Sequence, residues 1–351
     1  TTTHTSTTKG YANLYTTLIS GMNLKNGESP NFEIIEGHIY QPKISGKWTE
    51  VQWEKSNDGG LTFYDTPMKT VFETDEIVQI PTGILTAMNS DATVYSLVID
   101  GILDITKGNK LTLKHTANDL SDYNVHVHGT LLNSGGSFVN EEPQYKIDFH
   151  GGTYQHERNG GDVPAANWTT IFPNTAKQKV GKLMVTGLRD SALTSGLNQN
   201  FQDIEWNNIS QTVKQKLHGN VTVQGKLTMT TGIIQTDDKQ LKVLGSTEGG
   251  NDKSFVEGKL TYANTTLGNK RFPIGNANGY MPLVMDYTEL SDSSIITAEA
   301  INADLPTTLS SELVKVGNRY WKIDEAKTAV AKKFNLSIGR NGLTLADTPF
   351  V

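Results

Sequence analysis

Apolar and polar residues alternate in short runs along most of the chain. The runs are rich in Val, Ile, Leu, Thr and Tyr, and they are interrupted by Gly, Asn and Asp. Helical periodicity is scarce, whereas a period of two places alternate side chains on one face of a strand. The pattern therefore predicts an all-β protein.

A five-residue pattern recurs within these runs: apolar, any residue, Gly, any residue, apolar. Its two apolar residues and its Gly share one face of an extended segment, and Gly permits close approach of a neighbouring chain or a bend. Such repeats predict a parallel β-helix, a solenoid of stacked turns (here called coils) in which each coil buries its apolar face against its neighbours. The five copies of the pattern begin at Ile99, Val127, Leu217, Val223 and Val256.

Three regions follow from this reading. Residues 1–30 are rich in Thr and predict an N-terminal arm, and residues 31–263 predict the parallel β-helix with capping strands at its N-terminal end. The Gly-centred repeat stops near Asn264, and longer apolar segments follow. Residues 264–351 therefore predict a small antiparallel sandwich of the immunoglobulin-like type.

Composition narrows the classes of function. A chain of 351 residues with a net charge of −6 gives no electrostatic reason to expect a nucleic acid or an anionic membrane as partner. The sequence contains no Cys, which excludes disulfides and thiol chemistry, and no apolar run approaches the ~20 residues that span a bilayer. It begins TTTHTSTTKG without Met, as expected of a mature form whose targeting segment has been removed.

Two histidines, His126 and His128, stand two positions apart in NVHVHGTLLNSGG. Val125 and Val127 take the inward face of the predicted strand, so the two histidines are expected on its outward face. A metal site would require further ligands, for which His150 and His156 are the candidates. Surface histidines are the favoured interpretation, and no metal or other cofactor is predicted.

Trp48, Trp53 and Asp58 suggest a glycan platform, because aromatic faces stack on sugars and carboxylates bind hydroxyl groups. The favoured alternative is structural. Asp58-Gly59-Gly60 would form a tight turn with positive φ at the glycines, and the Trp side chains would cap the first coil.

Acidic residues supply candidates for glycoside cleavage, which requires two carboxylates across a cleft. The sequence places no two of them in one cleft, and each acidic pair is more often a solvated turn or strand face. Sequence motifs for a catalytic nucleophile, a zinc protease, a phosphate-binding loop and an EF-hand are absent. The segments 159–162 and 249–252 are interpreted as loops, with calcium sites as the less favoured alternative. We therefore predict no enzymatic activity, with a polysaccharide lyase or hydrolase as the catalytic alternative. The acidic candidates are Glu141, Glu142, Asp148, Glu157, Asp162, Asp203, Glu205, Asp237 and Asp238.

Several segments resemble large secreted β-helix surface proteins of Bacteroidetes and related bacteria, which type IX secretion exports. The resemblance is carried by GKWTEVQWEKSNDGGLTFYDTP (46–67), HGGTYQHERNGGDVPAANWTT (150–170), RFPIGNANGYMPL (271–283) and NRYWKID (318–324). It implies a right-handed β-helix, an extracellular or cell-surface location and no known catalytic residue. The sequence departs from the pattern after LTLADTPFV, where a sorting domain would be expected; such a domain is either cleaved or lacking.

The predicted sandwich is short of strands, since an immunoglobulin-like domain has about seven. An incomplete sandwich exposes a sheet edge, and the N-terminal arm is a candidate donor strand. Head-to-tail donation of this kind builds a fibre. We therefore predict a structural and adhesive subunit of a surface filament or layer whose partner is itself, with a carbohydrate-binding or carbohydrate-cleaving protein and a phage fibre as rivals. The donor residues are Tyr11, Leu14, Tyr15, Leu18 and Ile19.

Overall fold

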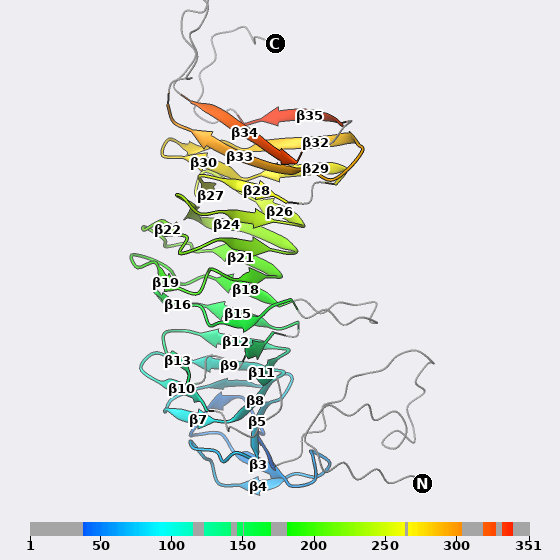
Figure 1. Cartoon of the computed structure of the whole chain (residues 1–351). Coiled ribbons are helices and arrows are strands. Elements are labelled where there is room, and N and C mark those ends of the chain that lie inside the picture. Colours follow the sequence, from blue (N-terminus) through cyan, green and yellow to red (C-terminus); the bar gives the residue numbers. More distant parts are fainter. Residues whose placement is uncertain are drawn as a thin grey trace, which may run out of the picture. The chain divides into compact units, whose positions relative to one another are not determined.

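The structure is a computed structural model that describes residues 38–114, 123–141, 146–149, 151–169, 181–263, 266–303, 319–327 and 332–339. Its regular secondary structure consists of strands, and the described residues contain no helix (Figure 1). No helix that would span a membrane occurs in these ranges. The prediction of an all-β protein is confirmed.

The chain divides into two compact units. The first unit comprises Thr1–Gln155 and Pro164–Gly181, and the second comprises His156–Val163 and Lys182–Val351. Each is built mainly of parallel strands.

In the first unit one sheet has the strand order β17-β14-β11-β8-β5-β1-β3-β4, a second includes β2-β6-β9-β12-β15, and a third is β13-β10-β7. Pairing is parallel from β17 to β1 and antiparallel from β1 to β4. The first sheet contains β1 (His38–Pro42), β3 (Trp53–Ser56), β4 (Tyr64–Thr66), β5 (Glu76–Ile80), β8 (Ser96–Ile99), β11 (Tyr123–Val127), β14 (Lys146–Asp148) and β17 (Ala166–Asn167). The second contains β2 (Gly46–Lys47), β6 (Leu85–Ala87), β9 (Ile102–Ile105), β12 (Thr130–Asn133) and β15 (Thr153–His156), and the third β7 (Ala92–Val94), β10 (Lys110–Leu113) and β13 (Ser137–Asn140).

In the second unit the sheets have the orders β18-β21-β24-β27-β30-β31, β20-β23-β25-β28-β33-β34, β29-β32-β35 and β16-β19. The first of these contains β18 (Lys182–Val185), β21 (Asp203–Asn207), β24 (Lys226–Gln235), β27 (Ser254–Glu257), β30 (Ile274–Asn276) and β31 (Gly279–Tyr280), with β22 (Gln215–Lys216) and β26 (Ser246–Gly249) also paired to β24. The second contains β20 (Asn200–Phe201), β23 (Val221–Val223), β25 (Leu241–Val243), β28 (Leu260–Tyr262), β33 (Ile295–Ile301) and β34 (Tyr320–Lys327). The others contain β29 (Gly268–Phe272), β32 (Leu283–Leu290), β35 (Lys332–Ile338), β16 (Gly161–Asp162) and β19 (Leu193–Ser195).

The register of the parallel strands pairs residues that are about 17 to 40 positions apart, close to the size of one repeat in solenoid proteins. Equivalent apolar residues are thereby stacked. In the first unit Val78 pairs with Leu97 and Leu97 with Val125, and all three side chains are fully buried. The parallel sheets of both units are therefore consistent with stacked coils.

The glycines of the repeated pattern occupy positions where the chain turns between two sheets. Gly101 lies between β8 and β9, and Gly129 lies between β11 and β12. A Cβ atom on Gly129 would meet the Gly101 carbonyl oxygen at 2.0 Å, and one on Gly245 would meet that of Gly225 at 2.1 Å. Both predicted roles of Gly, a corner and a close approach of neighbouring strands, are confirmed at these positions.

The predicted boundary near Asn264 does not separate two sheets. β30 continues the parallel stacking by pairing Ile274 with Val256 of β27. β33 adds to β28 in the antiparallel direction, pairing Ala298 with Leu260. β33 and β34 are therefore hydrogen-bonded extensions of a parallel sheet, because a β-strand edge can be continued in either direction, whereas β29, β32 and β35 form a separate antiparallel sheet.

Candidate functional site

The two tryptophans of the predicted glycan platform lie inside the first unit. Trp48 is 0% exposed and Trp53 is 1% exposed, their ring centroids are 4.8 Å apart, and both pack against Phe72. Their indole N–H groups donate to the carbonyl oxygens of Lys69 and Trp48, each at 2.9 Å. A sugar has no access to either ring, so the glycan platform is wrong and the capping role fits the packing.

A partly buried ion pair supports this aromatic cluster. Glu76 accepts hydrogen bonds from the Tyr40 hydroxyl at 2.8 Å and from the Lys69 ammonium at 2.6 Å. Burial alone would raise the pKa of Glu76, but bonds from Lys69, from the Glu73 N–H and from Tyr40 outweigh it and hold that pKa below its ordinary value. The Lys69 ammonium also lies 5.2 Å from the centre of the Tyr40 ring. This arrangement stabilises the cap.

Asp58 forms the tight turn that the sequence predicted. Its carboxylate accepts bonds from the Thr62 hydroxyl, the Ser56 hydroxyl and the N–H groups of Leu61 and Thr62. These bonds, with that of the Thr62 hydroxyl the largest cause, lower the pKa of Asp58 to about 2. Gly59 and Gly60 have φ of 70° and 89°, as expected. The carboxylate is therefore committed to the turn.

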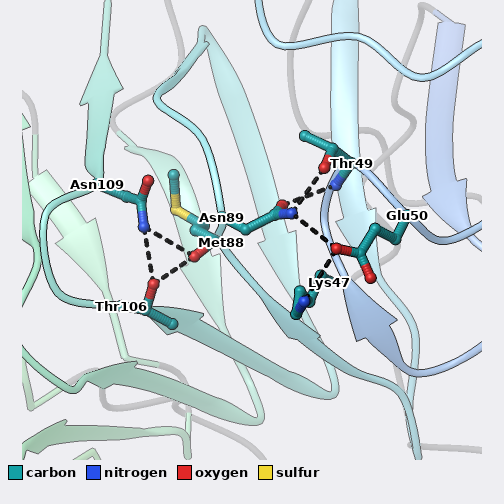
Figure 2. A network of polar contacts seen from close by, with 7 residues as sticks. All are labelled: Lys47, Thr49, Glu50, Met88, Asn89, Thr106 and Asn109. Atoms are coloured by element: carbon teal, nitrogen blue, oxygen red, sulfur yellow. Dashed lines mark hydrogen bonds and ion pairs between the residues drawn. The ribbon is translucent and has the colours of Figure 1, made fainter.

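Asparagine side chains connect successive parts of the chain in the first unit, as Figure 2 shows. Asn89 donates to the Thr49 hydroxyl at 2.7 Å and accepts from the Thr49 N–H at 3.0 Å, which joins the end of β6 to the connection between β2 and β3. Asn109 donates to the Met88 carbonyl oxygen at 3.0 Å and to the Thr106 hydroxyl at 2.8 Å. These bonds satisfy main-chain groups at turns, so the network is structural.

The paired histidines differ in environment. His126 is only 6% exposed, so the expectation that both lie at the surface is wrong for His126. Its neighbours in register on the same outward face, Val98 and Asp148, are also buried, which means that this part of the sheet is covered. His128 is exposed, and its Nδ1 lies 2.7 Å from Asp100 Oδ1.

The sequence offers two further histidines as candidate ligands alongside this pair. His150 lies outside the described residues, and His156, the last residue of β15, falls in the second unit, where it is 0% exposed. His156 Nε2 lies 2.9 Å from the Gly160 carbonyl oxygen and therefore carries the proton that it donates there. Burial lowers the pKa of His156 to about 4, so the ring is neutral at pH 7. Across the described residues no group of three or more His, Cys, Asp or Glu side chains is placed to hold a metal.

Most acidic candidates have local structural partners. Asp162 accepts from the hydroxyls of Thr194 and Ser195, Glu205 pairs with Lys182 at 3.0 Å, and Asp203 accepts from the Lys226 N–H at 2.7 Å. Five others are also placed by the structure, while Glu142 lies outside the described residues. Asp148 is buried and accepts from Asn167, Glu141 is near Lys114, Asp237 pairs with Lys216, and Asp238 pairs with Lys239. Glu157 is exposed.

The end of the second unit presents the most exposed apolar strand that the structure describes. In β35, Phe334, Leu336 and Ile338 are 38%, 50% and 47% exposed. They pair in register with Tyr287, Met285 and Leu283 of β32, whose side chains are at most 3% exposed. Directly paired residues project to the same face, so β35 extends an apolar core layer that is left partly uncovered.

A second edge strand, which belongs to another sheet, also exposes an apolar side chain. Ile323 of β34 is 38% exposed and pairs with the fully buried Ala298 of β33. Figure 1 shows β34 and β35 as the last labelled strands of the chain. We call Phe334, Leu336, Ile338 and Ile323 the open edge. The sequence predicted a strand at KKFNLSIGR and a sandwich that lacks some of its strands. It did not identify the residues of this exposed surface.

The predicted donor residues Tyr11, Leu14, Tyr15, Leu18 and Ile19 lie outside the described residues.

Comparison with protein-family models, with curated proteins and with solved structures gives no match. The resemblance to secreted surface proteins of Bacteroidetes therefore stays a prediction.

Proposed function

We propose that this chain is a non-catalytic structural subunit that assembles head to tail by strand donation into a filament or layer. The fold of the subunit is a right-handed parallel β-helix that passes into a strand-deficient antiparallel sandwich. The proposed location is extracellular, on the surface of a bacterium of the Bacteroidetes type that exports the chain by type IX secretion, and adhesion is the biological output.

The open edge carries this proposal. Three alternating apolar side chains on an edge strand expose 38% to 50% of their surface, and exposed apolar strands invite pairing with another chain. Strand addition would cover these side chains and satisfy main-chain groups at the same time. A subunit that donates a strand from its N-terminal segment and accepts one at β35 uses two different surfaces, and such a heterologous contact generates an open polymer when it does not close.

The test is electron microscopy of the full chain and of a variant that lacks residues 1–20. We expect polymers from the full chain and folded monomers from the variant, because the variant keeps every described strand but loses the donor. A deletion of residues 1–8 is the matched control, since it keeps residues 11–19 and should still polymerise. Unchanged polymers after removal of residues 1–20 would refute strand donation by the arm.

A further inference from the structure

The hydrogen bonds between β35 and β32 show which residues of β35 direct their main-chain N–H and C=O groups away from β32. The Gly339 N–H donates to the Pro282 carbonyl oxygen at 2.8 Å, and the β32–β35 register continues from Leu283 with Ile338 to this pair. In an antiparallel pair, residues directed toward the partner alternate with residues directed away from it. Ser337 therefore directs its N–H and C=O toward β32, whereas Phe334, Leu336 and Ile338 direct theirs to the far edge.

The same three residues therefore offer exposed apolar side chains and outward main-chain groups. Of the described strands, β32 is the one that pairs with β35. A strand that added to the far edge would bond to the main chain of Phe334, Leu336 and Ile338 and would pack its own side chains beside theirs on the same face.

The two edge strands of the open edge differ in chemistry. β35 reads KKFNLSI: it begins with Lys332 and Lys333, and Lys333 forms an exposed ion pair with Glu289 at 2.7 Å, whereas residues 334–338, FNLSI, contain no charge and no Pro. Charged residues and Pro on an edge strand protect natural sheet edges from pairing. β34 reads YWKIDEAK, and Lys322 and Asp324 form an exposed ion pair at 3.1 Å in the middle of the strand. We therefore call β34 the guarded edge and residues 334–338 of β35 the unguarded edge.

The N-terminal arm matches the unguarded edge in composition. Between Lys9 and Lys25 the sequence has no charged residue, and residues 11–19 read YANLYTTLI. Tyr, Thr and Ile favour strands, and as a strand this segment would place Leu14 and Leu18 on the same face. Docking it along FNLSI would bury apolar groups without removing a charge from water.

We infer that the donor strand is residues 11–19 of a second copy and that it adds to the far edge of β35, not to that of β34. This inference rests on the proposed function and specifies the acceptor. The donor main chain bonds to residues 334, 336 and 338, while Ser337 lies beside a donor residue on the opposite face.

The chain has no Cys, so engineered disulfides test this geometry directly. Ser337 is exposed, and in a non-hydrogen-bonded pair the Cα atoms are roughly 4.5 Å apart, within the range that a disulfide bridges. Ser337→Cys is combined in the full chain with Thr16→Cys or with Thr17→Cys, which sample the two faces of the donor. Gels without reductant should show a ladder of covalent multimers that collapses to monomer when reductant is added.

Asp324→Cys, combined with the same arm substitutions, is the matched control on the guarded edge, and Ser337→Cys alone controls for chance dimers. We expect at least tenfold less multimer from both. A ladder from Asp324→Cys but not from Ser337→Cys would overturn the inference. A monomeric disulfide of Ser337→Cys with the arm, or with Thr344→Cys near the C-terminus, would also overturn it, because the same chain would then cover the edge.

Electron microscopy of the unsubstituted chain tests the proposed function separately from the assignment of the acceptor to β35. Polymers that require residues 1–20 but give no cross-link through Ser337→Cys contradict the assignment to β35 and leave the proposed function standing. An absence of polymers under all conditions contradicts both.

Discussion

Large apolar side chains differ in exposure between two regions of the molecule. They are buried among the first described strands of the first unit and partly exposed on the last described strand of the second unit. Trp48 and Trp53 are at most 1% exposed beside the antiparallel strands β1, β3 and β4, whereas Phe334 and Leu336 on β35 are 38% and 50% exposed. Solenoids require caps because a terminal repeat has no neighbour to cover its core. The first region covers its large apolar side chains within the chain, and β35 leaves three of its apolar side chains partly exposed.

The largest expected difference between the two regions concerns stability. Trp53→Ala should lower the free energy of unfolding of the first unit by about 3–5 kcal/mol, the usual cost of removing a buried aromatic side chain. Leu336→Ala should cost less than about 1 kcal/mol, because half of that side chain is exposed to water already. Urea unfolding, monitored by hydrogen exchange in each unit, measures the change in the free energy of unfolding for both variants. Equal losses of unfolding free energy in the two variants would contradict the distinction between a covered and a partly exposed apolar region.

Acid should destabilise the second unit before the cap of the first. The neutral, buried His156 has a pKa of about 4 when folded, against an ordinary value of 6.5, so the unfolded chain binds the additional proton between these pH values. Stability is full above pH 6.5 and falls by about 3 kcal/mol as the pH approaches 4. His156→Gln should remove this dependence, whereas His218→Gln, at an exposed position, should keep it.

The cap should respond to acid only at lower pH. The pKa of Glu76 is depressed in the folded state, so its contribution is present above its ordinary pKa of 4.5 and is lost as the pH falls below it. Glu76→Gln should cost about 1.5–3 kcal/mol at pH 7, since charge-assisted bonds to a buried carboxylate are lost. Glu50→Gln is the control, because its ion pair with Lys47 is exposed and should contribute less than about 0.5 kcal/mol.

The smallest effect on stability should accompany a large effect on assembly. Leu336→Lys places a charge on the exposed face of β35, and its free energy of unfolding should stay within about 1 kcal/mol of that of the parent chain. Polymers should be lost, because a Lys at a sheet edge blocks pairing. Sedimentation at matched concentration checks this. Asn335→Lys, on the opposite face of the strand, should assemble more readily than Leu336→Lys.

Much of the fold was predictable because it depends on local patterns. Period-two alternation predicted the strands, and the Gly-centred pattern predicted the corners at Gly101 and Gly129. The continuation of the parallel sheet by β30 was not predictable, since its pairing with β27 depends on a long-range register that composition does not encode.

Exposure was the least predictable property of the candidate sites. Trp53 and Phe334 both stand in alternating strands, and the sequence does not distinguish a side chain covered by Phe72 from one with no covering strand among the described residues. The burial of His126 likewise depends on what covers the outer face of its sheet. Asp58 was predictable because an Asp before two glycines specifies a turn by local bonds alone.

Electron microscopy of the full chain beside Leu336→Lys tests strand acceptance by β35 most directly. The expected result is threads or layers from the parent chain and single particles from the variant, with both chains equally resistant to urea. Polymers of the same length and number from both chains would contradict the account.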